Sequence, residues 1–571
     1  MQETDLNTAS RQQALDNLRD QPDVTVLIIG GGINGIGVLY DLALQGVDTL
    51  LIDKGDFCGG TSAASTRIIH GGLRYLENSE FRLVREALKE RSRLLRNAPH
   101  YVRPLPITIP IFSWTRGLVH GAMQFFRLRN KPGDRGAILI EIGLTLYDAF
   151  AGRARLMPRH WFNSRRTALA KRPQLTPDIV CTATYYDARI AYPERLCLEL
   201  VMDAEAASPN ARALNYVSVA DAEGNTVTLC DGVTGQTFPV RPKIVVNATG
   251  AWIDFTNRTL HQDTQYIGGT KGSHLVIDNR QLWEATHGEM LYFTNSDGRI
   301  CIFYPFYDKV IAGSTDIPAD DPDAAVCDDF ETEYILDSVR KVFPTIPIRP
   351  SEIVFKFCGV RPLPRMDAAT PGQISRDHRC AVIPAGNGLA FPIYSLVGGK
   401  WTTYRAFAAQ VTDRILQALG RSRSTQTANR PIGGGKNYPQ TPVERQQWVA
   451  AQQGKTGLAA PRLETLLDRY GTHAEEIAAF IAAANDAPLD HVPGYSRREV
   501  QYLATCERVI HLEDLVLRRT LLGMLGQVDR AALEELAVVV APSLGWSDQQ
   551  ARQEIEQTAH LLRTRHGVQK V

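Results

Sequence analysis

The 571-residue chain lacks several features that would assign it quickly to a class of proteins. It has no run of about 18 uncharged apolar residues, so hydropathy predicts no membrane-spanning helix. Its nine cysteines include no Cys-x-x-Cys pair, and we therefore expect reduced thiols without zinc or iron–sulfur ligation, and no metal site. Residues 1–22 contain no apolar run and carry acids that a mitochondrial transit peptide would avoid.

The chain also lacks a large net charge of either sign. Its 63 Lys+Arg oppose 62 Asp+Glu, a formal charge of +1, which argues against a general nucleic-acid binder. Hydrophobic residues at 44% and charged residues at 22% are ordinary for a globular protein. The length is too great for one compact core, so we expect two or three domains.

The pattern of apolar residues predicts an α/β protein. Val24–Ile29 and Thr49–Ile52 are short apolar strands, and Asn34–Gln45 between them is helical, which is a βαβ unit with a parallel sheet. Beyond it, strand and helix patterns interleave without repeats, which indicates a nucleotide domain and a sheet-rich second domain built from several segments. The expected strands are Lys243–Asn247, His274–Ile277, Ile300–Tyr304, Val310–Ala312 and Ile353–Phe357, and the expected helices are Glu80–Arg96 and Trp401–Leu419.

The character of the sequence changes after Arg430. Residues 431–435 (PIGGG) form a cluster of helix breakers suited to a linker, and the remainder is mostly helical. We therefore predict a polar N-terminal tail with one short helix over residues 1–22, a discontinuous core over 23–430 and a helical C-terminal domain over 431–571. The expected C-terminal helices include Glu464–Arg469, Ala474–Ala484, Arg498–Thr520 and Asp529–Val540.

A glycine-rich turn lies between the first strand and its helix. Residues 30–35 (GGGING) fit G-x-G-x-x-G, in which bare glycines let the backbone approach a pyrophosphate at the positive end of a helix. Asp53 ends the second strand, where its carboxylate can accept hydrogen bonds from a ribose diol. Alone the glycine pattern is weak, but with both strands, the helix and the acid it predicts a dinucleotide site rather than an ordinary tight turn.

Three further segments favour FAD over NAD. Residues 59–65 (GGTSAAS) form a small-residue loop able to lie along a flavin, and residues 246–252 (VNATGAW) form a strand that ends in a glycine turn. Residues 396–403 (LVGGKWTT) are a similar strand whose glycines open a helix. Helix N-termini and free amides stabilise the charge of a reduced flavin, and contacts from distant segments suit a long cofactor.

Five further motifs are distinctive. They are residues 68–76 (IIHGGLRYL), 271–274 (KGSH), 313–316 (GSTD), 359–362 (GVRP) and 398–400 (GGK). Together they closely resemble the signatures of the FAD-dependent, quinone-linked glycerol-3-phosphate dehydrogenases, from about Asp23 to Ala408 and more weakly beyond. The chain departs from the family's common pattern with Arg67 in place of Lys and with Asp53 in place of a frequent Glu, but both changes keep the charge. It shows no EF-hand pattern near its end, which disfavours the calcium-regulated mitochondrial branch.

The resemblance implies a Rossmann-like FAD domain with an interleaved sheet-rich substrate domain and an all-helical C-terminal domain. It implies oxidation of sn-glycerol 3-phosphate to dihydroxyacetone phosphate, with hydride passing from C2 to FAD N5 and then electrons to membrane quinone. The residues expected to bind FAD are Gly30, Gly32, Asn34, Gly35, Asp53, Thr61, Ser62, Ser65, Gly250, Gly398, Gly399, Lys400 and Thr402. The residues expected to bind the substrate are Arg74, Tyr75, Lys271, Arg361 and Arg376.

The substrate's phosphate dianion needs several cations, because burying it is otherwise too costly. A lone arginine is more often a surface ion pair, and Arg376 has such an alternative in Asp377. Arg361, which lies between Val360 and Pro362, is the least like a surface residue. For the proton of the C2 hydroxyl, His70 and His274 are the candidate bases, although each could equally brace a loop, and a cation such as Arg361 could stabilise the alkoxide instead.

Basic residues gather in one stretch of the chain. Residues 103–172 hold 13 Lys/Arg and 3 Asp/Glu, a local charge of +10 in a chain that is otherwise −9. Aromatic residues are interleaved with them: Phe112, Trp114, Phe125, Phe126, Trp161 and Phe162. This composition suits an anionic membrane surface, with a solvated basic loop as the alternative. Nucleic-acid binding fits the charge, but no nucleic-acid module is recognisable.

We therefore expect a cytoplasmic enzyme held at the inner face of the cell membrane. One alternative is a glycerol-3-phosphate oxidase that reduces oxygen to peroxide. Another is a flavin-bearing interaction protein with vestigial activity, against which the intact set of site residues argues. The sequence leaves a homo-oligomer, the quinone site and the role of the C-terminal domain open.

Overall fold

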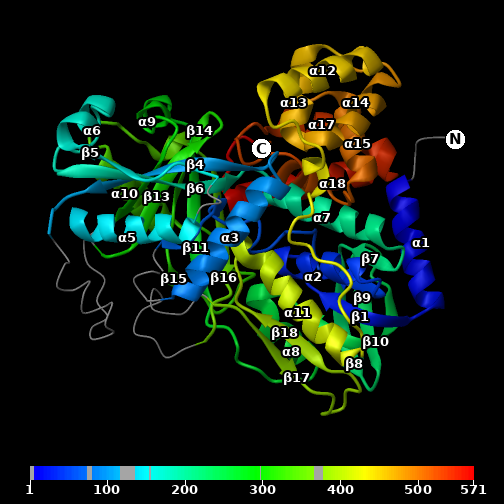
Figure 1. Ribbon diagram of the computed structural model, residues 1–571. Helices are drawn as coiled ribbons and strands as arrows, with labels where there is room; N and C mark the ends of the chain where they lie inside the picture. The colour runs from blue at the N-terminus through cyan, green and yellow to red at the C-terminus, as the bar shows by residue number, and fades with distance from the viewer. Residues whose placement is uncertain (1–5, 74–79, 116–135, 153–155, 296, 366–376) are drawn as a thin grey trace.

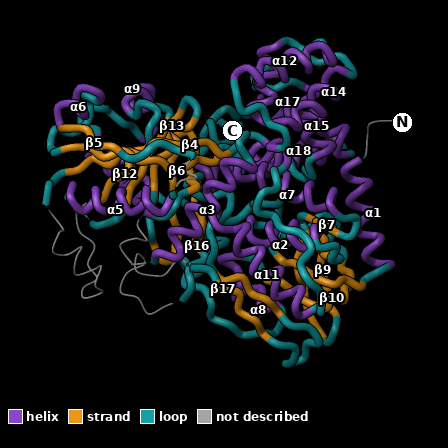
Figure 2. The backbone as a smooth tube through the Cα atoms, viewed as in Figure 1, coloured by secondary structure: helices purple, strands orange, loops and turns teal. Residues whose placement is uncertain are grey.

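The computed structural model describes residues 6–73, 80–115, 136–152, 156–295, 297–365 and 377–571 (Figure 1). It contains two mixed sheets and a group of C-terminal helices (Figure 2). Along the chain, strands of the two sheets and the helices that flank them alternate. The predicted α/β class with an all-helical C-terminal part is confirmed. The boundaries at residues 23 and 431 stay predictions.

The first sheet is built around the predicted βαβ unit. Strand β1 (Asp23–Ile29), helix α2 (Ile33–Leu44) and strand β2 (Thr49–Ile52) lie within one or two residues of the predicted ranges. The apolar residues of both strands are almost all buried, as expected for a parallel sheet covered on both faces. Helices α7 (Pro193–Ala207) and α11 (Tyr404–Ala418) pack against α2.

The strand order of this sheet places its ligand-binding edge. The order is β17-β18-β10-β1-β2-β7, and every neighbouring pair from β18 to β7 is parallel. The chain leaves β1 for β2 on one side and reaches β10 on the other, so the order reverses beside β1. Ligands bind outside the carboxyl ends of strands at such a point. The remaining members are β7 (Ala211–Leu214), β8 (Val217–Glu223), β9 (Thr226–Asp231), β10 (Thr237–Asn247), β17 (Arg379–Ile383) and β18 (Ile393–Val397).

The second sheet has ten strands and forms the left part of Figure 1. Its order is β15-β11-β14-β13-β12-β4-β6-β3, with β16 also paired to β11 and β5 to β6. The predicted strands of this region are confirmed, most of them longer than expected. The strands are β3 (Ile68–Ile69), β4 (Val102–Ile111), β5 (Trp161–Ser164), β6 (Cys181–Ile190), β11 (Thr270–Ile277), β12 (Met290–Thr294), β13 (Ile300–Phe306), β14 (Lys309–Gly313), β15 (Ile317–Pro318) and β16 (Ile353–Arg361).

Helices flank the two sheets, and the two predicted over Glu80–Arg96 and Trp401–Leu419 are confirmed as α3 (Phe81–Asn97) and α11, the latter preceded by a 3₁₀ turn at Trp401–Thr403. The others are α5 (Ala137–Ala151), α6 (Arg165–Lys171), α8 (Ile253–Thr259), α9 (Arg280–Ala285) and α10 (Asp329–Val342).

The C-terminal part is helical, as predicted, and forms the yellow to red region of Figure 1. Its helices are α12 (Pro442–Thr456), α13 (Ala460–Tyr470), α14 (Ala474–Ala482), α15 (Arg497–Cys506), α16 (Leu512–Asp514), α17 (Arg530–Leu544) and α18 (Asp548–His566). The single helix predicted over Arg498–Thr520 is wrong, because α15 ends at Cys506 and Arg508 has a positive φ of 57°. The carbonyls released by this break, those of Glu507 and Arg508, accept hydrogen bonds from Arg519.

The glycine cluster and the N-terminal segment both pack against the rest of the protein. The glycines at 433–435 are buried rather than part of an exposed linker, and a Cβ on Gly433 would lie 2.1 Å from Glu199 Oε2. The helix expected within residues 1–22 is α1 (Leu6–Asp20). Leu15 and Leu18 share one face of α1 and are fully buried, and Arg11 Nη2 donates to Asp231 Oδ1 at 2.7 Å.

No helix among the described residues is long and apolar enough to cross a bilayer.

Candidate active site

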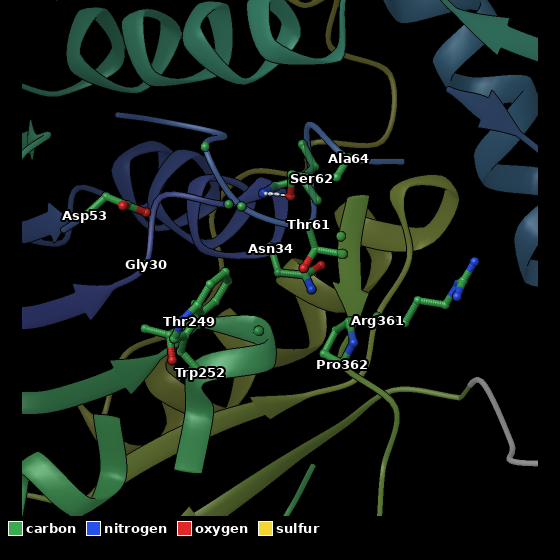
Figure 3. Close-up of a pocket in the computed structure, with 18 of the residues that line it drawn as sticks. Gly30, Asn34, Asp53, Thr61, Ser62, Ala64, Thr249, Trp252, Arg361 and Pro362 are labelled. Carbon is green, nitrogen blue, oxygen red and sulfur yellow. Dashed lines mark hydrogen bonds between the residues drawn. The ribbon is translucent and has the colours of Figure 1, made fainter. Parts of the chain in front are cut away.

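A cavity of about 700 Å³ lies at the carboxyl ends of β1, β2, β10 and β18 and extends to β11 and β16 of the second sheet. Figure 3 shows Asp53 and Gly30 toward one side of its lining and Arg361 and Pro362 toward the other, with Asn34 and Thr61 between them. The cavity therefore joins the two predicted parts of the site, the dinucleotide motif and the cationic substrate motif.

Three of the four glycines of the turn, Gly30, Gly32 and Gly35, show two different roles. Gly30 has φ +110°, and a Cβ there would lie 2.7 Å from the carbonyl oxygen of Ala248 on the neighbouring segment. A Cβ on Gly35 would lie 2.0 Å from the carbonyl oxygen of Gly30. Both glycines are needed for the turn itself. Gly32 caps α2, and among the described residues a Cβ there would meet only Ser62 Oγ, at 3.2 Å, so Gly32 keeps the backbone open toward the cavity.

Asp53 is fixed at the end of β2 by backbone amides. Gly31 N–H donates to Oδ2 at 2.6 Å, and Gly55 N–H donates to Oδ1 at 2.9 Å. Burial raises the pKa of Asp53 to about 6, against the opposite effect of these two amides. The carboxylate lines the cavity, where it can accept a hydrogen bond from a diol.

The small-residue loop connects the two sheets. Thr61 Oγ1 donates to the carbonyl of Val360 on β16 at 2.7 Å, and Ser62 Oγ accepts from Ile33 N–H at 3.1 Å. The indole of Trp401 donates to the carbonyl of Ser62 at 2.8 Å. The loop, with Ser65, lies along the cavity between the start of α2 and the end of β16.

The predicted segment 396–403 meets the glycine turn of residues 30–35. Gly398 and Gly399 have φ of +80° and +104°, and Asn34 Nδ2 donates to the carbonyl of Gly398 at 3.4 Å. Gly250, Lys400 and Thr402 also line the cavity. Among the described residues, the buried polar atoms of the lining without a hydrogen-bond partner include Asn34 Oδ1, the indole nitrogen of Trp252 and His274 Nδ1.

The far end of the cavity carries a fixed cation. Arg361 ends β16, and its guanidinium donates to Asp316 Oδ1 at 3.1 Å, to Ser314 Oγ at 3.0 Å and to the carbonyl of Thr315 at 3.0 Å. It lies over Gly272 of β11, where a Cβ would approach it to 2.1 Å. Its side chain is 22% exposed, so an anion in the cavity can reach it.

Both candidate bases line the cavity. His274 is buried, stacks on Phe357 with ring centroids 4.8 Å apart, and has its Nε2 2.9 Å from Thr66 Oγ1. Burial and the charges of Arg361 and Arg67 lower the pKa of His274 to about 3. A histidine with so low a pKa is a poor proton acceptor at neutral pH. His70 follows β3 and is only partly buried.

Lys271 does not line this cavity. Neighbouring side chains of a strand point to opposite faces, so Lys271 of β11 faces away from Gly272 and His274. Its ammonium lies 2.7 Å from Glu331 Oε2 and 3.1 Å from Asp328 Oδ2. The structure thus places it in an acidic cluster rather than beside Arg361. Three other predicted substrate residues lie outside the described residues: Arg74, Tyr75 and Arg376.

Other lining residues were not among the predicted ones. Trp252 is the last residue of segment 246–252, which the sequence pattern assigned to FAD binding, although Trp252 itself was not predicted as a binding residue. Glu513 and Arg518 come from the C-terminal helices and line the cavity near Asp53. No local motif marks them, because they reach the site only through long-range packing.

The comparisons with known proteins agree with this geometry. Residues 25–405 match the family model described as FAD dependent oxidoreductase, and residues 425–551 match the C-terminal domain of alpha-glycerophosphate oxidase. A glycerol-3-phosphate dehydrogenase from Synechocystis sp. is 32% identical, over 93% of this chain and 95% of its own length. The chain belongs to the FAD-dependent glycerol-3-phosphate dehydrogenase family.

Two solved structures share the family's fold. The glycerol-3-phosphate dehydrogenase from Bacillus halodurans complexed with FAD has a TM-score of 0.75 at 22% identity, and covers 98% of each chain. The L-alpha-glycerophosphate oxidase from Mycoplasma pneumoniae with FAD bound has a TM-score of 0.51 at 18% identity, over 72% of this chain and 98% of its own. At these identities the likeness concerns the fold.

The residues that line the cavity fit FAD, the cofactor of this family. Gly32 and the start of α2 leave room and positive potential for the pyrophosphate, and Asp53 offers an acceptor for the ribose diol. Asn34 Oδ1 and the Trp252 nitrogen, which no described residue hydrogen-bonds, give a bound cofactor polar atoms to satisfy. When bound, FAD supplies a hydride acceptor.

Proposed function

We propose that this protein oxidises sn-glycerol 3-phosphate to dihydroxyacetone phosphate, with hydride transfer from C2 to FAD N5, and passes the electrons to membrane quinone. The observation that carries the proposal is Arg361, a fixed cation in the lining of the FAD cavity, which His70 and His274 also line. The relatives with dehydrogenase names support the same substrate.

Arg361 is the residue proposed to bind the phosphate. Guanidinium groups bind phosphate oxygens in pairs, and this one is held in place by Ser314 and Thr315. Its other partner, Asp316, is a single carboxylate at 3.1 Å that a dianion can replace. Arg74, Tyr75 and Arg376 remain proposed contributors, whereas Lys271 would have to leave Glu331 to take part.

His70 is the proposed acceptor of the hydroxyl proton. The low pKa of His274 leaves that residue neutral at physiological pH, where its role is to position the loop through Thr66. The positive charge of Arg361 also favours an alkoxide that develops nearby.

We propose that α5 is the part of the basic segment 103–172 that binds the anionic inner face of the cell membrane, which would place the protein in the cytoplasm. Ile138, Ile142 and Leu146 are 45%, 51% and 37% exposed and follow one another at four-residue spacing on one face. Trp114, 58% exposed, is joined to this helix because Ile138 N–H donates to its carbonyl at 3.3 Å. Such a stripe can bury apolar area in an interface, and the basic composition of segment 103–172 suits anionic headgroups.

The electron acceptor is tested by comparing a quinone analogue with oxygen in one preparation. We expect oxidation of sn-glycerol 3-phosphate with a soluble quinone analogue to exceed peroxide release by a wide margin, and anionic lipid to increase it. Fast peroxide release in lipid-free buffer would instead identify an oxidase. No flavin reduction by the substrate in the absence of oxygen would reject both activities and leave the flavin-bearing interaction protein.

The membrane surface is tested by flotation with anionic vesicles. We expect the double variant Ile138→Ser, Ile142→Ser to lose vesicle binding and lipid stimulation. The matched control is Val443→Ser, Val538→Ser, which removes two valines that are 61% and 68% exposed on the C-terminal helices. Equal binding by both variants would place the membrane surface elsewhere.

A further inference from the structure

Two arginines of the C-terminal helical part bind one buried carboxylate of the FAD domain. Arg519 Nη1 and Nη2 donate to Asp56 Oδ2 and Oδ1 at 2.6 and 2.9 Å, and Arg518 Nε donates to Oδ2 at 2.6 Å. Asn215 Nδ2 donates to Oδ1 at 3.0 Å. Burial alone would raise the pKa of Asp56, but the charges of Arg519 and Arg518 outweigh it and lower the pKa to about 2. The carboxylate is therefore ionised, although its side chain is fully buried.

Asp56 is part of the wall of the FAD cavity. It follows Asp53 by three residues, and its carbonyl accepts from Gly59 N–H at 3.1 Å. Cys58 N–H donates to the carbonyl of Gly31 at 2.8 Å, which ties the same segment to the glycine turn. Residues 53–60 thus form one continuous piece of backbone along the cavity, and Asp56 is the point where the C-terminal helices hold it.

The C-terminal helices also reach the cavity directly. Arg518 and Glu513 line it at the end where Asp53 lies. Arg518 Nη2 donates to Asp514 Oδ1 at 2.6 Å and to Glu513 Oε1 at 3.0 Å. Tyr216, another lining residue, donates to the same Asp514 oxygen at 2.5 Å. Acidic groups would crowd this end of the cavity without the two arginines, and an FAD pyrophosphate adds further negative charge.

We propose that the C-terminal helical domain is part of the FAD-binding site, because Arg518, Arg519 and Asp56 hold residues 53–60 in the conformation that binds the adenosine half of the cofactor. Arg518 and Arg519 are positioning residues in this role. Docking of the C-terminal helices and retention of FAD are then coupled, and each stabilises the other. The inference rests on the FAD site and is independent of the substrate and the electron acceptor.

The test measures FAD affinity by flavin fluorescence on flavin-stripped protein titrated with FAD. We expect Arg518→Gln to raise the Kd for FAD by about tenfold or more, since removing one partner exposes the ionised Asp56 to the cofactor's charge. The matched control is Arg469→Gln, which breaks a pair of 2.9 Å with the buried Glu499 in the same domain but does not line the cavity. It should lower Tm and leave the Kd for FAD within about twofold of wild type.

Two results would overturn the proposal. One is a folded Arg518→Gln protein with unchanged FAD affinity, and the other is an equal loss of affinity in both variants, which would reflect general destabilisation. Hydrogen exchange on the wild-type chain covers the case in which Arg518→Gln fails to fold. FAD should slow amide exchange in residues 507–520 at least about fivefold. Protection confined to the two sheets, with none in this segment, would also reject the coupling.

Discussion

Tyr147 of helix α5 donates a hydrogen bond of 2.6 Å from its hydroxyl to Asp187 Oδ1 of strand β6. The same carboxylate oxygen accepts the backbone N–H of Gly71 at 3.0 Å, directly after His70. The buried face of α5 is therefore connected to the segment that carries the proposed base, while its opposite face carries the exposed apolar stripe. One helix thus links the proposed membrane surface to the active site.

This relationship predicts a kinetic effect of Tyr147→Phe. Asp187 would lose one of its donors in a buried site, which costs about 1–2 kcal/mol of folding stability, and the His70 segment would be held less firmly. We expect kcat/KM to fall about tenfold, because His70 would be positioned less accurately for the reaction. Tyr502→Phe is the control, because it removes a 3.1 Å bond to Glu476 far from the cavity. Similar losses of kcat/KM in the two variants would show that the contact of Tyr147 with Asp187 does not affect catalysis through His70.

The glycine turn predicts a graded series of substitutions. Gly32→Ala adds only a Cβ at 3.2 Å from Ser62 Oγ and should fold and retain FAD with reduced affinity. Gly32→Val carries its branches into the space of the pyrophosphate, so we expect folded protein without flavin. Gly35→Ala places a Cβ 2.0 Å from a backbone oxygen and should impair folding itself. The flavin absorbance per chain and Tm of all three separate these effects, and full flavin in Gly32→Val would contradict the assignment.

Arg361 predicts a loss in kcat/KM that exceeds any loss in stability. If its guanidinium binds the phosphate, Arg361→Ala should lower kcat/KM by about a hundredfold or more, and Arg361→Lys should recover part of it. The control is Arg365→Ala, an exposed arginine four residues later that bonds Gln265 at 2.8 Å. FAD content should stay near wild type in all three. A flavin-loaded Arg361→Ala enzyme with less than about a tenfold loss would assign Arg361 to bracing residues 314–316.

His274 predicts a contribution to the pH dependence of stability. Its folded pKa of about 3 lies below the unfolded value near 6.5, so between these values the unfolded chain binds the extra proton. The stability contributed by the neutral ring is complete above pH 6.5 and is lost as pH falls below it. In His274→Gln, the loss of unfolding free energy between pH 7.5 and 4.5 should be about 2 kcal/mol smaller than in wild type.

Urea unfolding at the two pH values measures this difference. His261→Gln is the control, since that ring is exposed and its Nε2 lies 2.8 Å from Asp221 Oδ1 on the surface. Identical pH dependence in wild type and His274→Gln would show that the ring is not buried in its neutral form in solution.

The local elements of this protein follow from the sequence alone. Alternating apolar runs, breakers and the glycine turn locate β1, α2 and β2 within one or two residues, because each depends on neighbours a few positions away. The FAD motif and Arg361 belong to the same group, since a turn and a strand end are local features. The break after Cys506 does not, because its freed carbonyls are satisfied by Arg519, eleven or more residues along the chain.

Only the tertiary structure decided which charges meet. Lys271 and Arg361 are both cations in family motifs, yet strand alternation and strand pairing direct Arg361 into the cavity and Lys271 onto Glu331. Asp56 and Arg519 lie 463 residues apart and carry no shared pattern, but packing of the C-terminal helices brings them to 2.6 Å. Sequence periodicity predicts which helix or strand carries a side chain and on which face of it the side chain lies. The partner of a buried charge depends on how distant elements pack. That packing is determined by residues throughout the chain, so no local pattern predicts it.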